Sequence, residues 1–236
     1  SPAGRFAGRK STTGWSREEE EPVQVGRYNS EVVSDLELAD ILRRPEGPRR
    51  TALLVAWFQG LYPDGEGTPV LVGGAAVELF TRGGYTTGDL DFVGQVPPAV
   101  ATRLTEAGFE RRGRHWAHEA GRVFLELPGR RLEPASDPVR LRRAGRELLV
   151  IAPEALLADR LAAWKFWGST VDAAHALLLI RALGAKLDGR LAARLARSLE
   201  VDDERVRLTR FARRLGGRGP VAKELGRWLA QRPGRR

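Results

Sequence analysis

The sequence predicts an α/β protein with a mixed sheet and flanking helices, followed by a C-terminal helical bundle. Short apolar runs that end in glycines or polar turns indicate buried strands, and the last of them ends at residue 151. Apolar residues at helical spacing continue from Pro153 onward. The 236 residues suffice for one large domain or two small ones. We expect a flexible tail over 1–30, a core over 31–151 and a helical domain over 152–236.

Helices and strands alternate in the expected core. The first helix follows Asn29-Ser30 and ends before Pro45. Further core helices are expected over 49–61, 74–82 and 97–107, and strands over 69–72, 90–93, 109–112, 114–118, 122–127 and 148–151. The polar stretch 128–146 shows no clear periodicity. The C-terminal helices are expected over 153–167, 170–183, 188–199, 202–214 and 219–231.

The chain is strongly basic, and its basic residues are almost all arginines. The net charge is +9, and with only four lysines, 35 of the 39 basic residues are arginines. Arginine binds phosphate groups through two parallel hydrogen bonds, which favours a nucleic-acid partner. Codon bias in a GC-rich genome would also produce many arginines. Under either explanation, the excess of positive charge favours a polyanionic partner or substrate.

Several classes of protein are excluded by composition. The chain has no run of about 18 apolar residues, so we expect no membrane span. The first ten residues lack the apolar stretch of a secretory signal. Cysteine is absent, which excludes disulfides and thiolate metal sites. We therefore expect a cytoplasmic protein.

Two glycines directly follow a buried strand. The apolar run ends at Val72, and a helix is expected to begin at Gly73-Gly74. Because glycine has no side chain, the backbone there can approach a phosphate closely, and the N-terminus of a helix offers N–H donors and a favourable dipole. The segment therefore predicts a phosphate-binding turn.

Two aspartates alternate with apolar residues on the next strand. Because successive side chains of a strand point to opposite faces, Asp89 and Asp91 share one face, while Leu90 and Phe92 face the core. Neighbouring carboxylates repel each other unless a cation lies between them. Such a pair suits Mg²⁺ (or Mn²⁺) bound against phosphate oxygens. Glu126, on a later strand, is the candidate third carboxylate of a two-metal site.

The ordered combination resembles the DNA polymerase beta-like nucleotidyltransferase superfamily. Its hallmark is a hydrophobic residue, then Gly and Gly or Ser, a spacer, and Asp-hydrophobic-Asp/Glu-hydrophobic. Here Gly74-Ala75 takes the Gly-Ser position, residues 76–88 form the spacer and Asp89 begins the closing motif. Ala75 departs from the usual serine. A glycine turn followed by a surface strand with two solvated aspartates would give the same pattern without any activity.

A second stretch resembles the AbiEii and MenT toxin group of nucleotidyltransferases. That group has a Pro-Glu-x-Leu helix with a Lys-Leu-x-Ala step, then Asp-x-x-Asp at the start of the next helix. Here Arg160 stands at the lysine position, Asp172 matches, and His175 replaces the second aspartate. Lys165 could take the role of the missing lysine. Over residues 68–180 the resemblance implies these nucleotide-binding residues: Gly73, Gly74, Ala75, Thr87, Arg160, Lys165 and Asp172.

Five other residues attract attention without a clear function. His115 and His118 are predicted to face opposite sides of one strand, which argues against a shared metal. Trp164 and Trp167 lie on one side of their expected helix, where core packing is favoured over stacking on a base. His175 lies in an apolar helix, so packing is likewise favoured over a role as a base.

The resemblance implies an enzyme that transfers a nucleoside monophosphate from an NTP to an acceptor and releases pyrophosphate. In this interpretation Asp89 and Asp91 hold the metal, and Glu126 assists as the third catalytic carboxylate. The basic charge and the toxin-like resemblance favour RNA, particularly tRNA, as the acceptor, and a toxin would have an antitoxin protein as partner. Two alternatives stay open. These are transfer to a small molecule, and a catalytically silent module that binds nucleic acid or a protein partner.

Overall fold

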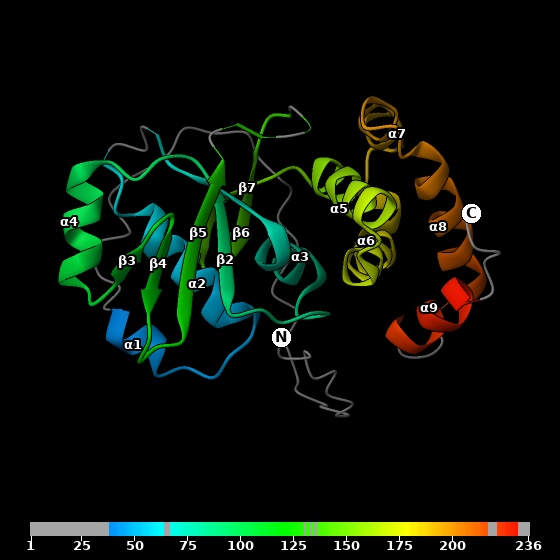
Figure 1. Cartoon of the computed structure of the whole chain (residues 1–236). Coiled ribbons are helices and arrows are strands. Elements are labelled where there is room, and N and C mark those ends of the chain that lie inside the picture. The colour runs from blue at the N-terminus through cyan, green and yellow to red at the C-terminus, as the bar shows by residue number, and fades with distance from the viewer. Residues whose placement is uncertain are drawn as a thin grey trace.

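The computed structural model describes residues 38–63, 67–129, 131–132, 134, 136–216 and 221–230. The expected tail over 1–30 lies outside these residues. Seven strands form one mixed sheet in the order β3-β4-β5-β2-β1-β7-β6 (Figure 1). The strands are β1 (Val70–Val72), β2 (Asp89–Val93), β3 (Glu110–Arg112), β4 (His115–His118), β5 (Val123–Gly129), β6 (Val139–Arg143) and β7 (Arg146–Val150). The predicted α/β class with a mixed sheet is therefore confirmed.

The helices of the sheet region are α1 (Leu38–Leu42), α2 (Pro48–Gln59), α3 (Gly73–Thr81) and α4 (Pro98–Glu106). The chain then continues in α5 (Pro153–Trp167), α6 (Thr170–Leu183), the 3-10 turn η3 (Gly184–Lys186), α7 (Gly189–Ser198), α8 (Asp202–Leu215) and α9 (Val221–Ala230). Within the described part of the chain, no strand follows Val150. Helical structure after the sheet was predicted from the apolar spacing, and it is confirmed.

Strand β6 lies in the stretch that showed no clear periodicity. It pairs with β7 in an antiparallel register at one edge of the sheet. Arginines follow Val139 and Leu141 in the sequence, and only Leu141 in this strand is buried. An edge strand needs few apolar residues, because one side and much of one face remain in solvent. The alternation of apolar and polar residues in β6 is therefore too short and too polar to predict a strand from the sequence.

Helix α2 lies behind the sheet in Figure 1 and is tied to it by one buried amide. Gln59 is 2% exposed, and its Nε2 donates to the carbonyls of Pro69 at 2.9 Å and Leu149 at 2.8 Å. Its Oε1 accepts from the N–H of Leu149 at 3.0 Å. The side chain thus satisfies backbone groups next to β1 and within β7, where the parallel pairing of these strands is short.

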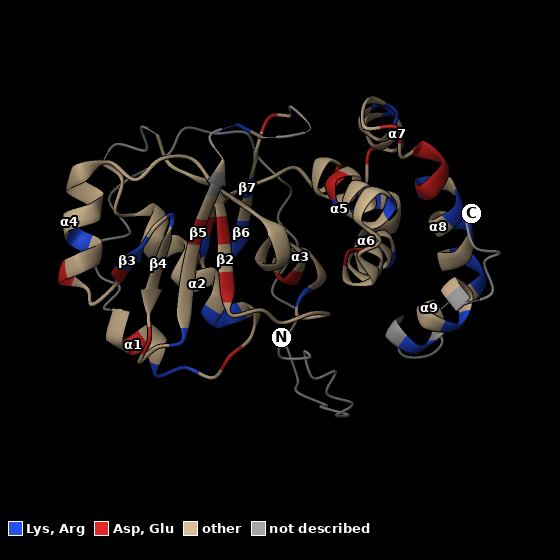
Figure 2. Ribbon diagram, viewed as in Figure 1, with Lys and Arg blue, Asp and Glu red and all other residues tan. Residues whose placement is uncertain are grey.

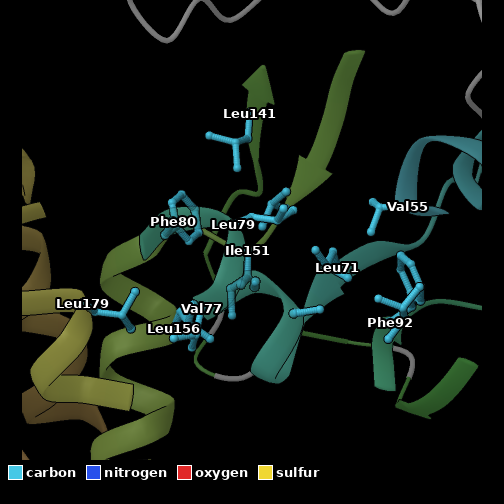
Figure 3. Packing of buried hydrophobic residues seen from close by; sticks show 14 of the residues in the cluster. Val55, Leu71, Val77, Leu79, Phe80, Phe92, Leu141, Ile151, Leu156 and Leu179 are labelled. Atoms are coloured by element: carbon cyan, nitrogen blue, oxygen red, sulfur yellow. The ribbon is translucent and has the colours of Figure 1, made fainter. Parts of the chain in front are cut away.

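One continuous core runs through the sheet and the first C-terminal helices. Val77 and Phe80 of α3 pack near Leu156 of α5 and Leu179 of α6 (Figure 3). The same cluster of buried residues extends to Leu225 of α9. Apolar contacts therefore continue across residue 151, where a boundary between a core domain and a helical domain is expected. The boundary itself stays a prediction.

The two tryptophans of α5 have different environments. Trp164 is 7% exposed, and its ring lies 6.0 Å from that of Trp228. Trp167 is 86% exposed, so the predicted packing is wrong for this residue. It is the last residue of the helix, before Gly168 turns the chain with a φ of 70°. Among the described helices none has the length and apolarity needed to cross a bilayer.

Candidate functional site

Strands β2 and β5 place the three predicted carboxylates on one face of the sheet. The two strands are parallel, and Asp91 pairs in register with Glu126. Asp89 lies two residues before Asp91 and therefore on the same face, while Leu90 and Phe92 are 2% and 0% exposed on the other. The acidic segments of β2 and β5 lie side by side in Figure 2. The predicted alternation is confirmed, and the sheet itself sets the spacing of the carboxylates.

Gly73 and Asp91 fit together so closely that any side chain at position 73 would displace the Asp91 carboxylate. Val72 at the end of β1 pairs with Asp91 across the antiparallel ladder. Gly73 has a φ of +67°, and a Cβ there would lie 2.0 Å from Asp91 Oδ2. The N–H of Gly74 donates to the Asp91 carboxylate. The carboxylate therefore lies against the N-terminus of α3, where the helix dipole favours a negative charge.

The negative charges around Asp91 outweigh the positive charge and the hydrogen bond that oppose them. Burial raises the pKa of Asp91 above its ordinary value, and the charges of Glu126 and Asp89 raise it further. Arg160 and the N–H of Gly74 act in the opposite direction but do not cancel these effects. Excess negative charge on one half-buried face is the condition under which a divalent cation binds favourably.

Glu126 is held from its outer side by basic residues of the neighbouring hairpin. Arg114 Nη2 lies 2.8 Å from Glu126 Oε1, and His115 Nδ1 lies 3.6 Å from Oε2. His115 pairs with Glu126 across β4 and β5, whereas His118 pairs with Val123 on the opposite face, as predicted for the two histidines. In the part of the chain described, no three acidic or histidine side chains converge as a preformed metal cluster. The donor types and the register fit a divalent cation, but Glu126 would have to turn away from Arg114 to join its ligands.

Arg160 reaches the site from α5 and is bound by two aspartates. Its Nη1 lies 2.7 Å from Asp172 Oδ1, and its Nε donates to Asp159 Oδ2 at 2.9 Å. The Arg160 side chain is 19% exposed and lies near enough to Asp91 for their charges to interact. Burial alone would raise the pKa of Asp172, but His175 and Arg160 hold it below its ordinary value. The resemblance implies that Arg160 and Asp172 bind nucleotide, and the structure places both near the face that carries Asp91.

The three remaining predicted nucleotide-binding residues differ from one another in their distance from the carboxylates and in their exposure. Thr87 lies beside the glycines, and its Oγ1 accepts from the N–H of Asp89 at 3.1 Å. Ala75 is fully buried, so it could reach a ligand only through its backbone. Lys165 is not brought to the carboxylates. Its Nζ donates to the carbonyl of Glu200 and lies 3.8 Å from Glu204 Oε2, against the turn between α7 and α8.

Sequence reasoning missed Tyr85, which links the glycine turn to α6. A Cβ on Gly74 would lie 3.3 Å from Tyr85 Cε1. The tyrosine ring meets the ring of His175 edge-on, with centroids 4.2 Å apart. His175 is 4% exposed, as predicted for a packing residue, and its Nδ1 lies 3.7 Å from Asp172 Oδ1. A single aromatic residue in a turn rich in Gly and Thr gives too weak a signal to identify this role.

Sequence reasoning also missed Glu78, a carboxyl group beneath the glycine turn. Glu78 is fully buried in α3 and accepts a hydrogen bond from Thr51 Oγ1 at 3.0 Å. Burial raises its pKa to about 7, although hydrogen bonds from Thr51 and the backbone of Thr87 oppose the rise. The signal was present, since Glu78 is the one charged residue in the apolar run from Ala75 to Phe80. It supports the turn that carries Thr87 into β2.

Comparisons with protein-family models, with curated proteins and with solved structures found no match to this chain.

Proposed function

We propose that this chain is a divalent-metal-dependent nucleotidyltransferase, which transfers a nucleoside monophosphate from an NTP to an acceptor and releases pyrophosphate. The observation that carries the proposal is the placement of Asp91. It lies in register with Glu126 on one side and against Gly73 and the N-terminus of α3 on the other. A carboxylate set for a cation and a helix N-terminus for phosphate groups thus adjoin, as transfer from a triphosphate requires.

The roles of the residues follow from their positions. Asp89 and Asp91 would hold Mg²⁺ or Mn²⁺, which when bound would neutralise charge on the phosphate oxygens. The backbone N–H groups at the start of α3 would bind phosphate oxygens. The Gly74 N–H, which donates to the Asp91 carboxylate, would first have to release it. Glu126 is the residue to orient the acceptor hydroxyl and accept its proton. Arg114 and His115 hold its side chain from the side of the neighbouring hairpin.

We propose a nucleic acid, and specifically RNA, as the acceptor. The net charge of +9 favours a polyanion. A tRNA acceptor, a toxin role and an antitoxin partner rest on the resemblance alone and stay predictions, as does the cytoplasmic location. One observation favours a silent binding module instead, since Glu126 is turned toward Arg114 rather than toward Asp91.

The test is incubation of the protein with each α-³²P-labelled NTP, Mg²⁺ and total tRNA. The Asp89→Ala/Asp91→Ala double variant, checked for folding by circular dichroism, is the control. We expect label on RNA with the unmodified protein only. Pyrophosphate release without labelled RNA would indicate a small-molecule acceptor. Absence of both turnover and metal-dependent NTP binding in calorimetry would overturn the enzymatic proposal and leave the silent module.

A further inference from the structure

A basic recess lies at the beginning of the two strands that carry the carboxylates. The recess is small, with a volume of about 20 Å³, and it opens to solvent. Gly88 directly precedes β2 and Arg122 directly precedes β5, and both line the recess. Leu90 and Val123 form its floor, so it lies on the face of the sheet opposite to Asp91. Thr87, which lies beside the glycine turn, also lines the recess, so the recess adjoins the candidate active site from the other face of the sheet.

Arg50 in the wall of the recess is a buried cation with incomplete pairing. Its side chain is 9% exposed, and Nη2 donates to the carbonyl of Gly121 at 2.6 Å. Its Nε is buried without a hydrogen-bond partner among the residues described. A buried guanidinium that lacks a close anion is costly, because its hydration is lost without full replacement. The arrangement suits an anion bound from the open side of the recess.

Arg122 and Glu46 show where that anion would lie. Glu46 Oε1 is 3.9 Å from Arg50 Nη1 and also 3.9 Å from Arg122 Nη1. Both distances are too long for hydrogen bonds, and Glu46 is 58% exposed. One carboxylate thus occupies the position between two guanidinium groups without binding either closely. A phosphate group, with more acceptor oxygens, could bond to both arginines at once.

The N-terminus of α2 adds a third element to the recess. Gly47 is the N-cap of this helix of 12 residues, and no side chain in the described structure caps it. Gly47, Arg50 and Thr51 all line the recess. The first N–H groups of an uncapped helix lack intrahelical acceptors, and the helix dipole favours an anion near them. The helix end and the two arginines therefore favour the same kind of ligand.

We infer that this recess binds a backbone phosphate of the acceptor polynucleotide, with Glu46 displaced when the strand binds. The inference rests on the proposed function and adds to it a site for the acceptor strand. The triphosphate is the less suitable ligand, because its phosphates belong at Gly73 and Gly74 on the carboxylate side. The recess would hold the strand through its backbone, so binding there is independent of base sequence.

The experiment measures affinity of the full chain for a single-stranded RNA over a series of salt concentrations. The variants are Arg122→Asn, which tolerates the φ of +51° at this position, and Glu46→Gln, which removes the competing carboxylate. Matched controls on the exposed face of α4 are Arg103→Asn and Glu106→Gln, which change the net charge by the same amounts. Binding is measured in the unmodified protein and in the Asp89→Ala/Asp91→Ala background, so that turnover does not affect it.

We expect Arg122→Asn to weaken binding several-fold and to reduce the slope of log affinity against log salt by about 0.7. Glu46→Gln should strengthen binding, and both controls should change it less. Equal effects of the recess variants and their controls would overturn the inference, as would no RNA binding at all. The nucleotidyl-transfer assay is run in parallel. Loss of the recess effect with intact transfer refutes the recess only, and a retained effect without transfer refutes the proposed function only.

Discussion

The carboxylate of Asp91 occupies the space that a side chain on Gly73 would need. A Cβ at position 73 would lie 2.0 Å from Asp91 Oδ2, and the φ of +67° is itself unfavourable for any residue except glycine. The strand ladder sets this proximity, because Val72 and Asp91 are direct partners. The glycine turn and the aspartate pair, which lie well apart in the sequence, therefore form a single structural unit.

Replacing Gly73 should damage both folding and activity. We expect Gly73→Ala to destabilise the protein by at least about 1 kcal/mol from the left-handed backbone alone, and by more because Asp91 must move. Nucleotidyl transfer should fall in parallel. The control is Gly189→Ala in α7, where no atom lies within 4 Å of the added Cβ. Urea denaturation of both variants checks the prediction, and equal stabilities would contradict it.

Neutralising Asp91 should separate stability from activity. Its pKa is raised in the folded protein by burial and by Glu126 and Asp89, so the ionised group destabilises the fold at pH values above its pKa. We therefore expect Asp91→Asn to be at least as stable as the parent at pH 8, with the advantage disappearing below pH 4. Transfer activity should fall at least about 100-fold. Loss of stability at pH 8 would show that the carboxylate mainly serves as a cap for α3.

Divalent cations should stabilise the native protein through the same carboxylates. At a metal concentration 100 times its dissociation constant, the expected stabilisation is about 2.7 kcal/mol. Thermal unfolding is followed with Mg²⁺ or Mn²⁺ and again after chelation with EDTA. The shift should disappear in Asp89→Asn/Asp91→Asn and persist in Glu147→Gln, an exposed carboxylate variant on β7. A shift that survives in the double variant would place the metal elsewhere.

Glu78 should make stability depend on pH near neutrality. Its folded pKa of about 7 lies above the ordinary value of 4.5, so the folded state holds the proton more tightly. The stability that this proton contributes is complete below pH 4.5 and is lost as the pH rises through 7. The shift corresponds to about 3 kcal/mol at pH 8. Glu78→Gln should therefore unfold at higher urea than the parent at pH 8 and at similar urea at pH 4.5, and a constant difference would refute this.

Arg160 should stabilise the folded protein through its pairs with Asp159 and Asp172. Its removal leaves the side chains of Asp172 and Asp159 without their cation, and Asp172 is only 17% exposed. We expect Arg160→Ala to cost about 2 kcal/mol. The matched control is Arg190→Ala, an exposed residue of α7. Because Asp172 is destabilised once ionised in the variant, Arg160→Ala/Asp172→Asn should recover part of the loss in chemical denaturation.

Much of the site could be predicted because it is encoded by local patterns. Alternation of Asp89 and Asp91 with apolar neighbours sets which face they occupy, and the strand pairing then adds Glu126. Arg114 and Tyr85 could not be found in this way. Their roles depend on strand order and on helix packing, which bring distant segments together without leaving a periodic signal.

The fold shows the same division. Helices α5 and α6 were predicted with their observed bounds, because long apolar periodicity and the Gly168–Ser169 break define them. Strand β6 escaped prediction because its stability comes from pairing with β7 rather than from its own apolar residues. The exposure of Trp167 could not be foreseen either, since spacing alone does not show that the helix end projects beyond its neighbours.

The bridge made by Gln59 has a consequence for the order of folding during synthesis. Its amide contacts Leu149, which follows it by 90 residues. Before that residue has left the ribosome, α2 and β1 can pack together. The Gln59 Oε1 then lacks its hydrogen-bond donor, and the Gln59 Nε2 lacks one of its two acceptors. Closure of the sheet by β7 is therefore a late event, and a ribosome-bound chain that ends before residue 149 should be far more sensitive to proteolysis than one that includes β7.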